Sequence, residues 1–130
     1  MKKTDTVSSK PNKQRKAYFN APAHRRTKQM SSHINLDDKD LKQYGRRSVP
    51  LHKGDTVKVL RGSHKGHSGN VTKILRKQML IEVEGVVMTK ADGKQTAKRI
   101  HPSNVMITKL DLSDPARKAR MESKVTKGGK

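Results

Sequence analysis

The chain has 130 residues, and its 31 Lys and Arg outnumber its 11 Asp and Glu, which gives a formal net charge of +20 at pH 7. This excess of positive charge indicates a polyanionic partner. Hydrophobic residues make up 30% of the chain and aromatic residues 2%, which is too little apolar material to bury all of it around one core. The absence of cysteine excludes disulfides, thiolate nucleophiles and Cys-containing zinc fingers. No apolar stretch resembles a secretory signal or a membrane span, so we expect a soluble, intracellular protein with no membrane partner.

The distribution of aliphatic residues divides the chain into three parts. Residues 51–110 hold 19 Val, Ile, Leu and Met, against 7 in residues 1–50 and 3 in residues 111–130. Lys and Arg are spread more evenly, with 13, 12 and 6 in residues 1–50, 51–110 and 111–130. We therefore expect a folded domain at 51–110, which alone builds the core, between a basic extension at 1–50 and a basic tail at 111–130.

The extension at 1–50 shows weak helical signals. Lys2–Lys16 has no periodicity and is expected to be disordered in the free protein. Pro22 followed by AHRRTKQM predicts a short helix that begins after a proline, and Asn35 and Gly45 would cap a second short helix around LDDKDLKQY. Neither segment has a strong apolar face.

Short strands are predicted throughout residues 51–110. Val57 and Val59 alternate within Asp55–Arg61, and Asn70–Leu75 is a second β-branched run. Met79–Glu84 alternates apolar and polar residues most clearly, so we expect one buried and one wet face. The Asp-Gly of residues 91–94 favours a tight hairpin turn between strands at 86–88 and 97–100, and the last strand is expected at 105–107.

Five or so short antiparallel strands in about 60 residues predict a mainly β domain in the form of a small closed or half-open barrel, because curling hides the strand edges. In the tail, Asp114-Pro115 followed by ARKARMESK predicts a short C-terminal helix.

The most informative segment is the loop RGSHKGHSG at Arg61–Gly69. Its glycines allow close approach of the backbone to a partner, and Arg61, His64, Lys65 and His67 supply donors for phosphate oxygens. A flexible, merely solvated hairpin loop is the alternative. The loop matches neither the Gly-x-x-x-x-Gly-Lys-Ser/Thr nor the Gly-x-Gly-x-x-Gly nucleotide pattern.

Enzyme and metal interpretations have little support. His64 and His67 lack a third ligand at a familiar zinc spacing, so we expect no metal or cofactor. Ser63, His64 and Asp55 are too close in sequence to converge as a catalytic triad, and no catalytic residue is expected. Glu82 and Glu84 are expected to be solvated or to pair with nearby Lys and Arg, rather than to act as an acid and base.

Three basic runs in the extension could bind nucleic acid or simply solubilise the chain. They are KPNKQRK at 10–16, HRRTK at 24–28 and GRRS at 45–48, and the net charge favours nucleic acid. With Tyr18, Phe19 and Tyr44 as the only aromatic residues, base stacking is scarcely available, so the ligand is expected to be folded RNA or a duplex read by its shape and backbone.

GDTVKVLRGSHKGHSGNVTKI at 54–74 resembles the KOW motif, a strand, glycine loop and strand whose hallmark glycine would be Gly66. VEGVVMTKADGK at 83–94, IHPSNVMITKLDLSD at 100–114 and SSKPNKQRKAYFNAPAHRR at 8–26 resemble the archaeal and eukaryotic type of the universal twenty-four family of large-subunit ribosomal proteins. Gln95–Arg99 departs from the family pattern. The likeness covers nearly the whole chain.

This resemblance implies an SH3-like barrel bound to the 5′ domain of large-subunit ribosomal RNA in the cytoplasmic ribosome. It also implies a place near the nascent-chain exit, neighbouring ribosomal proteins as partners, and a role early in subunit assembly. A small-molecule substrate and a homo-oligomer are not expected. The family's RNA-facing loops map onto 61–69 and 101–104, and with the basic runs they give the candidate RNA-binding residues: Lys10, Lys13, Arg15, Lys16, Arg25, Arg26, Lys28, Arg46, Arg47, Lys53, Arg61, Gly62, Ser63, His64, Lys65, Gly66, His67, Gly69, His101, Ser103 and Asn104.

Two other functions stay open at this point. A KOW domain could instead dock on the transcription machinery, although such factors usually carry an α/β domain before it. A protein with a charge of +20 could also coat nucleic acid in general.

Overall fold

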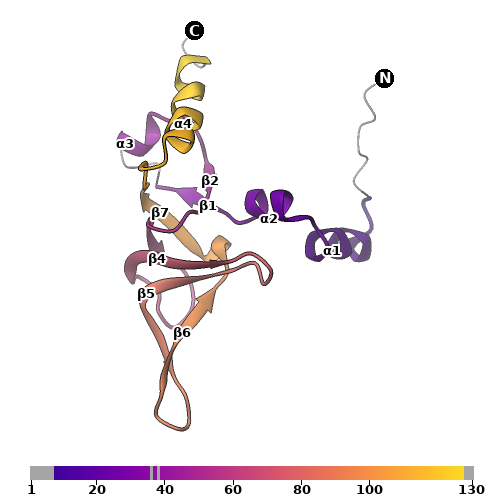
Figure 1. Ribbon diagram of the computed structural model, residues 1–130, viewed down its shortest axis with the longest axis vertical. Helices are drawn as coiled ribbons and strands as arrows, with labels where there is room; N and C mark the ends of the chain where they lie inside the picture. Colours follow the sequence, from indigo (N-terminus) through magenta and orange to yellow (C-terminus); the bar gives the residue numbers. More distant parts are fainter. Residues whose placement is uncertain (1–7, 36, 38, 128–130) are drawn as a thin grey trace.

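The computed structural model describes residues 8–35, 37 and 39–127. Within these ranges, four α-helices, seven strands and a 3-10 turn follow one another along the chain (Figure 1). They are α1 Pro11–Phe19, α2 Ala23–Gln29, β1 Ser31–Ile34, α3 Lys39–Lys42, β2 Ser48–Pro50, β3 Thr56–Val59, β4 Ser68–Leu75, β5 Leu80–Thr89, β6 Gln95–Ile100, η1 Pro102–Asn104, β7 Val105–Lys109 and α4 Pro115–Lys127. None of the described helices combines the length and hydropathy needed to cross a membrane.

The strands form one sheet in the order β2-β1-β7-β3-β4-β5-β6, with antiparallel neighbours except for the parallel pair β1 and β7. Register shifts between Val71 and Lys73 and between Glu82 and Val87 are the kind of irregularity that bends strands. The chain is a mixed α/β structure rather than mainly β, and the sheet is not closed into the expected SH3-like barrel, because β2 and β6 remain its ends across the described residues. The physical reason is that β1, a strand from the extension, occupies the second edge of β7.

The core follows the alternation that the sequence predicts. Val57 and Val59 are buried, as are Met79, Ile81 and Val83 on one face of the best-predicted strand. The expectation that residues 51–110 alone build the core is wrong, because the core also takes in side chains from both flanks. These are Met30, Ile34, Val49 and Met121. Strands β1 and β2 span only four and three residues, too few to show a periodicity.

The hairpin around residues 91–94 is also confirmed, with Val87 opposite Ala97 and Gly93 at a φ of +86° in the turn. Residues 86–88, however, continue β5 rather than forming a separate strand. The two strands reach well beyond the rest of the sheet (Figure 1). Val87 and Met88 on this arm are 41% and 51% exposed.

Helices α2 and α4 lie where the sequence predicts them, whereas α3 is shorter than the segment between Asn35 and Gly45. The expectation of disorder over Lys2–Lys16 is wrong from Pro11 onwards, because α1 begins there with the proline in its first turn; residues 2–7 lie outside the described part. No residue of α1 is buried. Because the helix has no buried apolar face, its sequence lacks the periodic apolar residues from which a helix is predicted.

A buried ion pair fastens α4 to the sheet. The two terminal guanidinium nitrogens of Arg117 donate to the two carboxylate oxygens of Asp55 at 2.6 and 2.8 Å. Asp55 is fully buried and Arg117 is 4% exposed. The same guanidinium donates to the carbonyls of Asp111 and Pro50, and the carboxylate also accepts from the backbone N–H groups of His52 and Asp111. A buried pair this fully hydrogen-bonded holds four chain segments in one arrangement.

We expect Arg117→Leu to lower the free energy of unfolding by about 3–5 kcal/mol, because it leaves the Asp55 carboxylate buried without its counter-charge. Urea denaturation of the two proteins measures the change. Arg120→Leu is the matched control, since Arg120 lies on the same helix with an exposed side chain, and its effect should stay within about 0.5 kcal/mol. Equal losses in both variants would contradict a special role for the buried pair.

Candidate nucleic-acid interface

The glycine loop connects β3 to β4 and is closed at its base by the backbone. The N–H of Val59 donates to the carbonyl of His67, and the N–H of Gly66 donates to the carbonyl of Val59, both at 2.8 Å. Gly66 has a φ of +87°, which side chains rarely adopt, and a Cβ built there would meet no atom within 4 Å. The backbone angle therefore favours glycine at this position, and the surface around it is open to a partner.

The second predicted loop, residues 101–104, lies beside the first. A backbone hydrogen bond from the N–H of Leu60 to the carbonyl of Asn104, at 2.8 Å, joins η1 to the start of the glycine loop. Side chains of both loops line one hollow of about 200 Å³, to which the glycine loop contributes Arg61, Ser63 and His64. The structure thus brings the two sequence-predicted loops together into one surface.

Two cations of this hollow were missed by the sequence analysis. Lys98 and Arg99, both on β6, line it as well, and the Lys98 ammonium donates to the hydroxyl of Ser63 at 2.9 Å. Arg99 pairs with Glu82 at 3.6 Å, as expected for that carboxylate, and also donates to the amide oxygen of Gln78. The sequence shows these two cations in β6, but only the folded sheet shows that they face the glycine loop and so belong to the candidate site.

His101 anchors α1 beside the hollow. Its Nδ1 accepts from the backbone N–H of Ser103 and lies 2.7 Å from the Ser103 hydroxyl, so the ring proton sits on Nε2. Nε2 then donates to the hydroxyl of Tyr18 at 3.1 Å, which ties the end of α1 to η1. The exposed cations of α1 are in this way held next to the two loops instead of being on a loose tail.

Some of the predicted RNA-binding residues make contacts within the chain. Arg26 donates to the carbonyls of Phe19 at 2.7 Å and Lys77 at 3.5 Å, and Arg46 donates to the carbonyl of Arg120 at 2.7 Å. His67 Nε2 bonds the carbonyl of Glu84 at 2.8 Å, with its ring against Gly85, where a Cβ would come within 2.7 Å of that nitrogen. These bonds give the three side chains a structural task, and their RNA contacts stay predictions.

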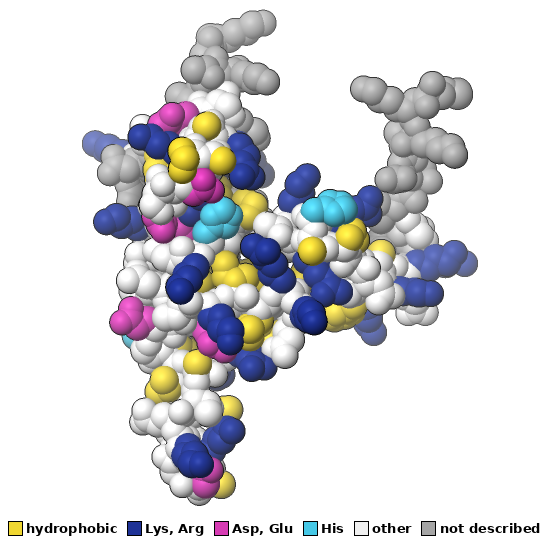
Figure 2. Space-filling model, viewed as in Figure 1, with side chains coloured by type: hydrophobic (Ala, Val, Ile, Leu, Met, Phe, Trp, Pro, Cys, Tyr) yellow, Lys and Arg dark blue, Asp and Glu magenta, His cyan; other side chains and the backbone are white. Residues whose placement is uncertain are grey.

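The other predicted residues are mostly on the surface. His64, Gly69 and Asn104 are half-buried. The exposed ones are Lys10, Lys13, Arg15, Lys16, Arg25, Lys28, Arg47, Lys53, Arg61, Gly62, Ser63, Lys65, Gly66 and Ser103. Lys and Arg side chains gather between α2, α4 and the sheet and along α1, with few acidic side chains among them (Figure 2).

Titration and metal chemistry play little part in this arrangement. Burial lowers the pKa of His52, and the guanidinium of Arg117 lowers it further against the opposing Asp55 carboxylate. Hydrogen bonds from the backbone and side chain of Ser113 lower the pKa of Asp111. Among the described residues, no three His, Asp or Glu side chains come together as a metal site, and Ser63 and Asp55 are bonded to different partners.

Comparison with known proteins gives a consistent result. The family model of ribosomal proteins, L26 in eukaryotes and L24 in archaea, matches residues 8–124. Large ribosomal subunit protein uL24 of Korarchaeum cryptofilum is 48% identical over 92% of this chain and 90% of its own length. The uL24 proteins of Methanothrix thermoacetophila and Methanosarcina barkeri are 50% and 49% identical, each over 85% of this chain and 94% of their own length.

We expect Gly66→Val to lower the free energy of unfolding by about 1 kcal/mol or more, because a β-branched residue is strained at positive φ. Gly66→Asn is the matched control, since asparagine tolerates this backbone region and should cost clearly less. Thermal or urea denaturation measures both. If valine and asparagine were equally well tolerated, the backbone angle would not be what requires glycine here.

Proposed function

The chain belongs to the family of eukaryotic L26 and archaeal L24 ribosomal proteins, and we propose that it binds the 5′ domain of large-subunit ribosomal RNA. As a member of this family it is a structural protein of the large ribosomal subunit in the cytoplasm rather than an enzyme. It binds the RNA by contacting the phosphate backbone and reading RNA shape. It lies near the nascent-chain exit beside other ribosomal proteins and assists an early step of subunit assembly.

The observation that carries this proposal is the surface formed by the glycine loop, η1 and the end of α1. Arg61 and Lys65 are exposed cations on a loop whose glycines keep the backbone accessible. Neither side chain has an ion-pair partner within the described part of the chain. These cations have no acidic partner, and they lie on an exposed loop whose base is closed by backbone hydrogen bonds. They suit phosphate oxygens, which are spaced along an RNA backbone irrespective of its sequence.

The remaining basic residues help RNA helices to pack together. We propose that residues 1–50 and 111–130 contribute cations beyond the central segment 51–110, which sets their position. RNA helices repel one another because of their phosphates, and cations placed between them relieve that repulsion while condensed counterions are released. A chain with a net charge of +20 can therefore stabilise the packing of several RNA helices at once.

Crosslinking of the protein to RNA in its native cells, followed by sequencing of the attached fragments, tests the proposal. We expect crosslinks confined to a few helices of large-subunit RNA, chiefly in the 5′ domain. Crosslinks spread over nascent transcripts would instead favour docking on the transcription machinery. Recovery of DNA would favour a general nucleic-acid coat. Either of these results would refute the ribosomal RNA assignment.

We expect Arg61→Ala and Lys65→Ala each to weaken binding to a 5′-domain transcript and to reduce the slope of log affinity against log salt concentration by roughly 0.7–0.9. Lys94→Ala, which removes the same charge at the β5–β6 turn, is the control and should change the slope less. Filter binding at several salt concentrations measures the slopes, and denaturation should show little change in folding. An unchanged slope in both loop variants would count against these contacts.

A further inference from the structure

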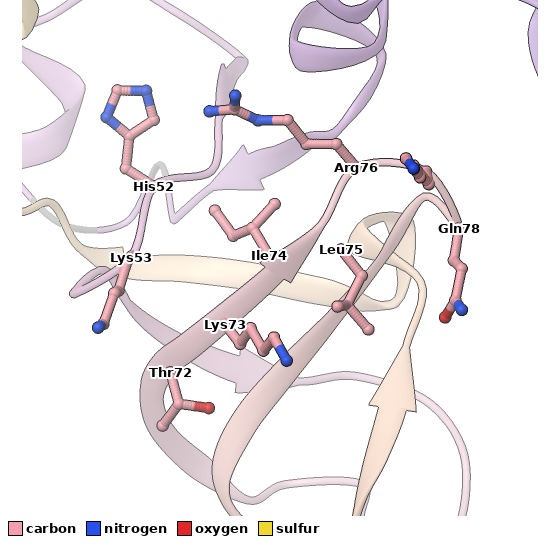
Figure 3. A pocket seen from close by; sticks show the side chains of 9 residues that line it. His52, Lys53, Thr72, Lys73, Ile74, Leu75, Arg76 and Gln78 are labelled. Carbon is pink, nitrogen blue, oxygen red and sulfur yellow. The ribbon is translucent and has the colours of Figure 1, made fainter.

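A second basic surface lies away from the predicted loops, along β4. It is a groove of about 780 Å³ bounded by His52 and Lys53, by strand β4 and by the turn that follows it (Figure 3). Apart from Lys53, none of its residues was a candidate for RNA binding from the sequence. The groove combines two kinds of lining, which together identify what it can hold.

The floor of the groove is apolar. Ile74 and Leu75 are both half-buried, and Ile74 packs against the hydrophobic core from its edge. The register shift between Val71 and Lys73 interrupts the strict alternation of β4. Two consecutive aliphatic side chains are thus left partly accessible, where a regular strand would bury one and expose the other.

The rim of the groove is cationic. Lys53, Lys73, Arg76 and Lys77 line it with exposed side chains, and no carboxylate lines it in the described structure. Within that same part of the chain, none of these four side chains takes part in a hydrogen bond or an ion pair. Four uncompensated cations around an aliphatic floor favour a ligand that is both flat and anionic.

Two planar groups flank the floor. In Figure 3, Ile74 points toward the space between the His52 ring and the Arg76 guanidinium. Planar guanidinium and imidazole groups stack readily on nucleobases. The lowered pKa of His52 is consistent with an uncharged, aromatic ring at this place.

We propose that this groove is an RNA subsite that receives an unpaired nucleotide, with its base against Ile74 and between His52 and Arg76. The flanking phosphates contact Lys53, Lys73 and Lys77. The inference rests on the proposed RNA-binding function and adds to it a second site, in which the protein contacts a base as well as the backbone. It gives a base-stacking contact to a chain whose aromatic residues are nearly absent.

The continuation of the groove favours RNA over an acidic peptide. His52 also lines a neighbouring hollow of about 540 Å³ between α2, β2 and α4, and Lys28, Arg46 and Arg120 are among its other lining residues. His52 is thus shared by two hollows with cationic linings, and the Lys and Arg side chains on either side of it make a basic track. A strand with one phosphate per nucleotide can follow such a track, whereas a peptide would need carboxylates at matching intervals.

NMR titration of the isotopically labelled full chain tests the base contact directly. The probe is adenosine 3′,5′-bisphosphate, with ribose 5-phosphate and inorganic phosphate as base-free controls. We expect saturable shifts of the Ile74 and Leu75 methyl signals and of the His52 ring with the bisphosphate only. Arg76→Gln should weaken this binding about fivefold, and Lys94→Gln, at the β5–β6 turn, should leave it unchanged. Equal methyl shifts with inorganic phosphate, or none with the bisphosphate, would overturn the nucleotide site.

Crosslinking in native large subunits separates failure of this inference from failure of the proposed function. Ultraviolet crosslinks of ribosomal RNA to a peptide containing residues 72–78 would support the groove. Crosslinks to the glycine-loop peptide alone would leave the proposed function intact and overturn the groove. Carbodiimide coupling of Lys73 or Lys77 to a carboxylate of a neighbouring protein would show an acidic peptide there and overturn it as well. Absence of RNA from both peptides would refute the proposed function itself.

Discussion

The Asp55 carboxylate is the point on which the arrangement of this basic chain depends. It accepts hydrogen bonds from both terminal nitrogens of Arg117 and from the backbone N–H groups of His52 and Asp111. One buried negative charge therefore fixes the entry to β3, the exit from β7 and the start of α4. The same helix also buries Met121 in the hydrophobic core, so the polar anchor and an apolar contact together hold α4 to the sheet.

Anchoring by hydrogen bonds also determines where the basic surfaces lie. Tyr18 ties α1 to His101, and Arg46 ties the segment before β2 to α4. Each of these two hydrogen bonds positions a segment that carries exposed Lys and Arg side chains. The described parts of the extension and the tail are thereby tied to the folded chain at these points, and the glycine-loop hollow and the groove along β4 are two separate basic surfaces of it.

Local patterns revealed the parts of the fold and site that are determined locally. The glycine loop, the Asp-Gly turn and the alternation of Met79–Glu84 were predictable because turn geometry and strand period depend on near neighbours. Strands β1 and β2 were not, since each becomes a strand only by pairing with distant residues. For the same reason Arg26 could not be told apart from Arg25 in sequence, although its guanidinium bonds carbonyls of Phe19 and Lys77.

The placement of the carboxylates explains how a folded protein keeps so much charge available. Asp55 and Glu82 pair with arginines, whereas Asp92, Asp111 and Asp114 accept backbone N–H groups two residues ahead in turns and at a helix start. Acidic groups used in this way stabilise local structure without neutralising the cations around the glycine loop or the groove. The self-repulsion of those cations then remains in the isolated chain, and the proposed binding to RNA phosphates would relieve it. Most of these carboxylates, together with a few arginines such as Arg117, thus serve the structure, while the exposed cations of the glycine loop and the groove stay without an acidic partner in the described part of the chain.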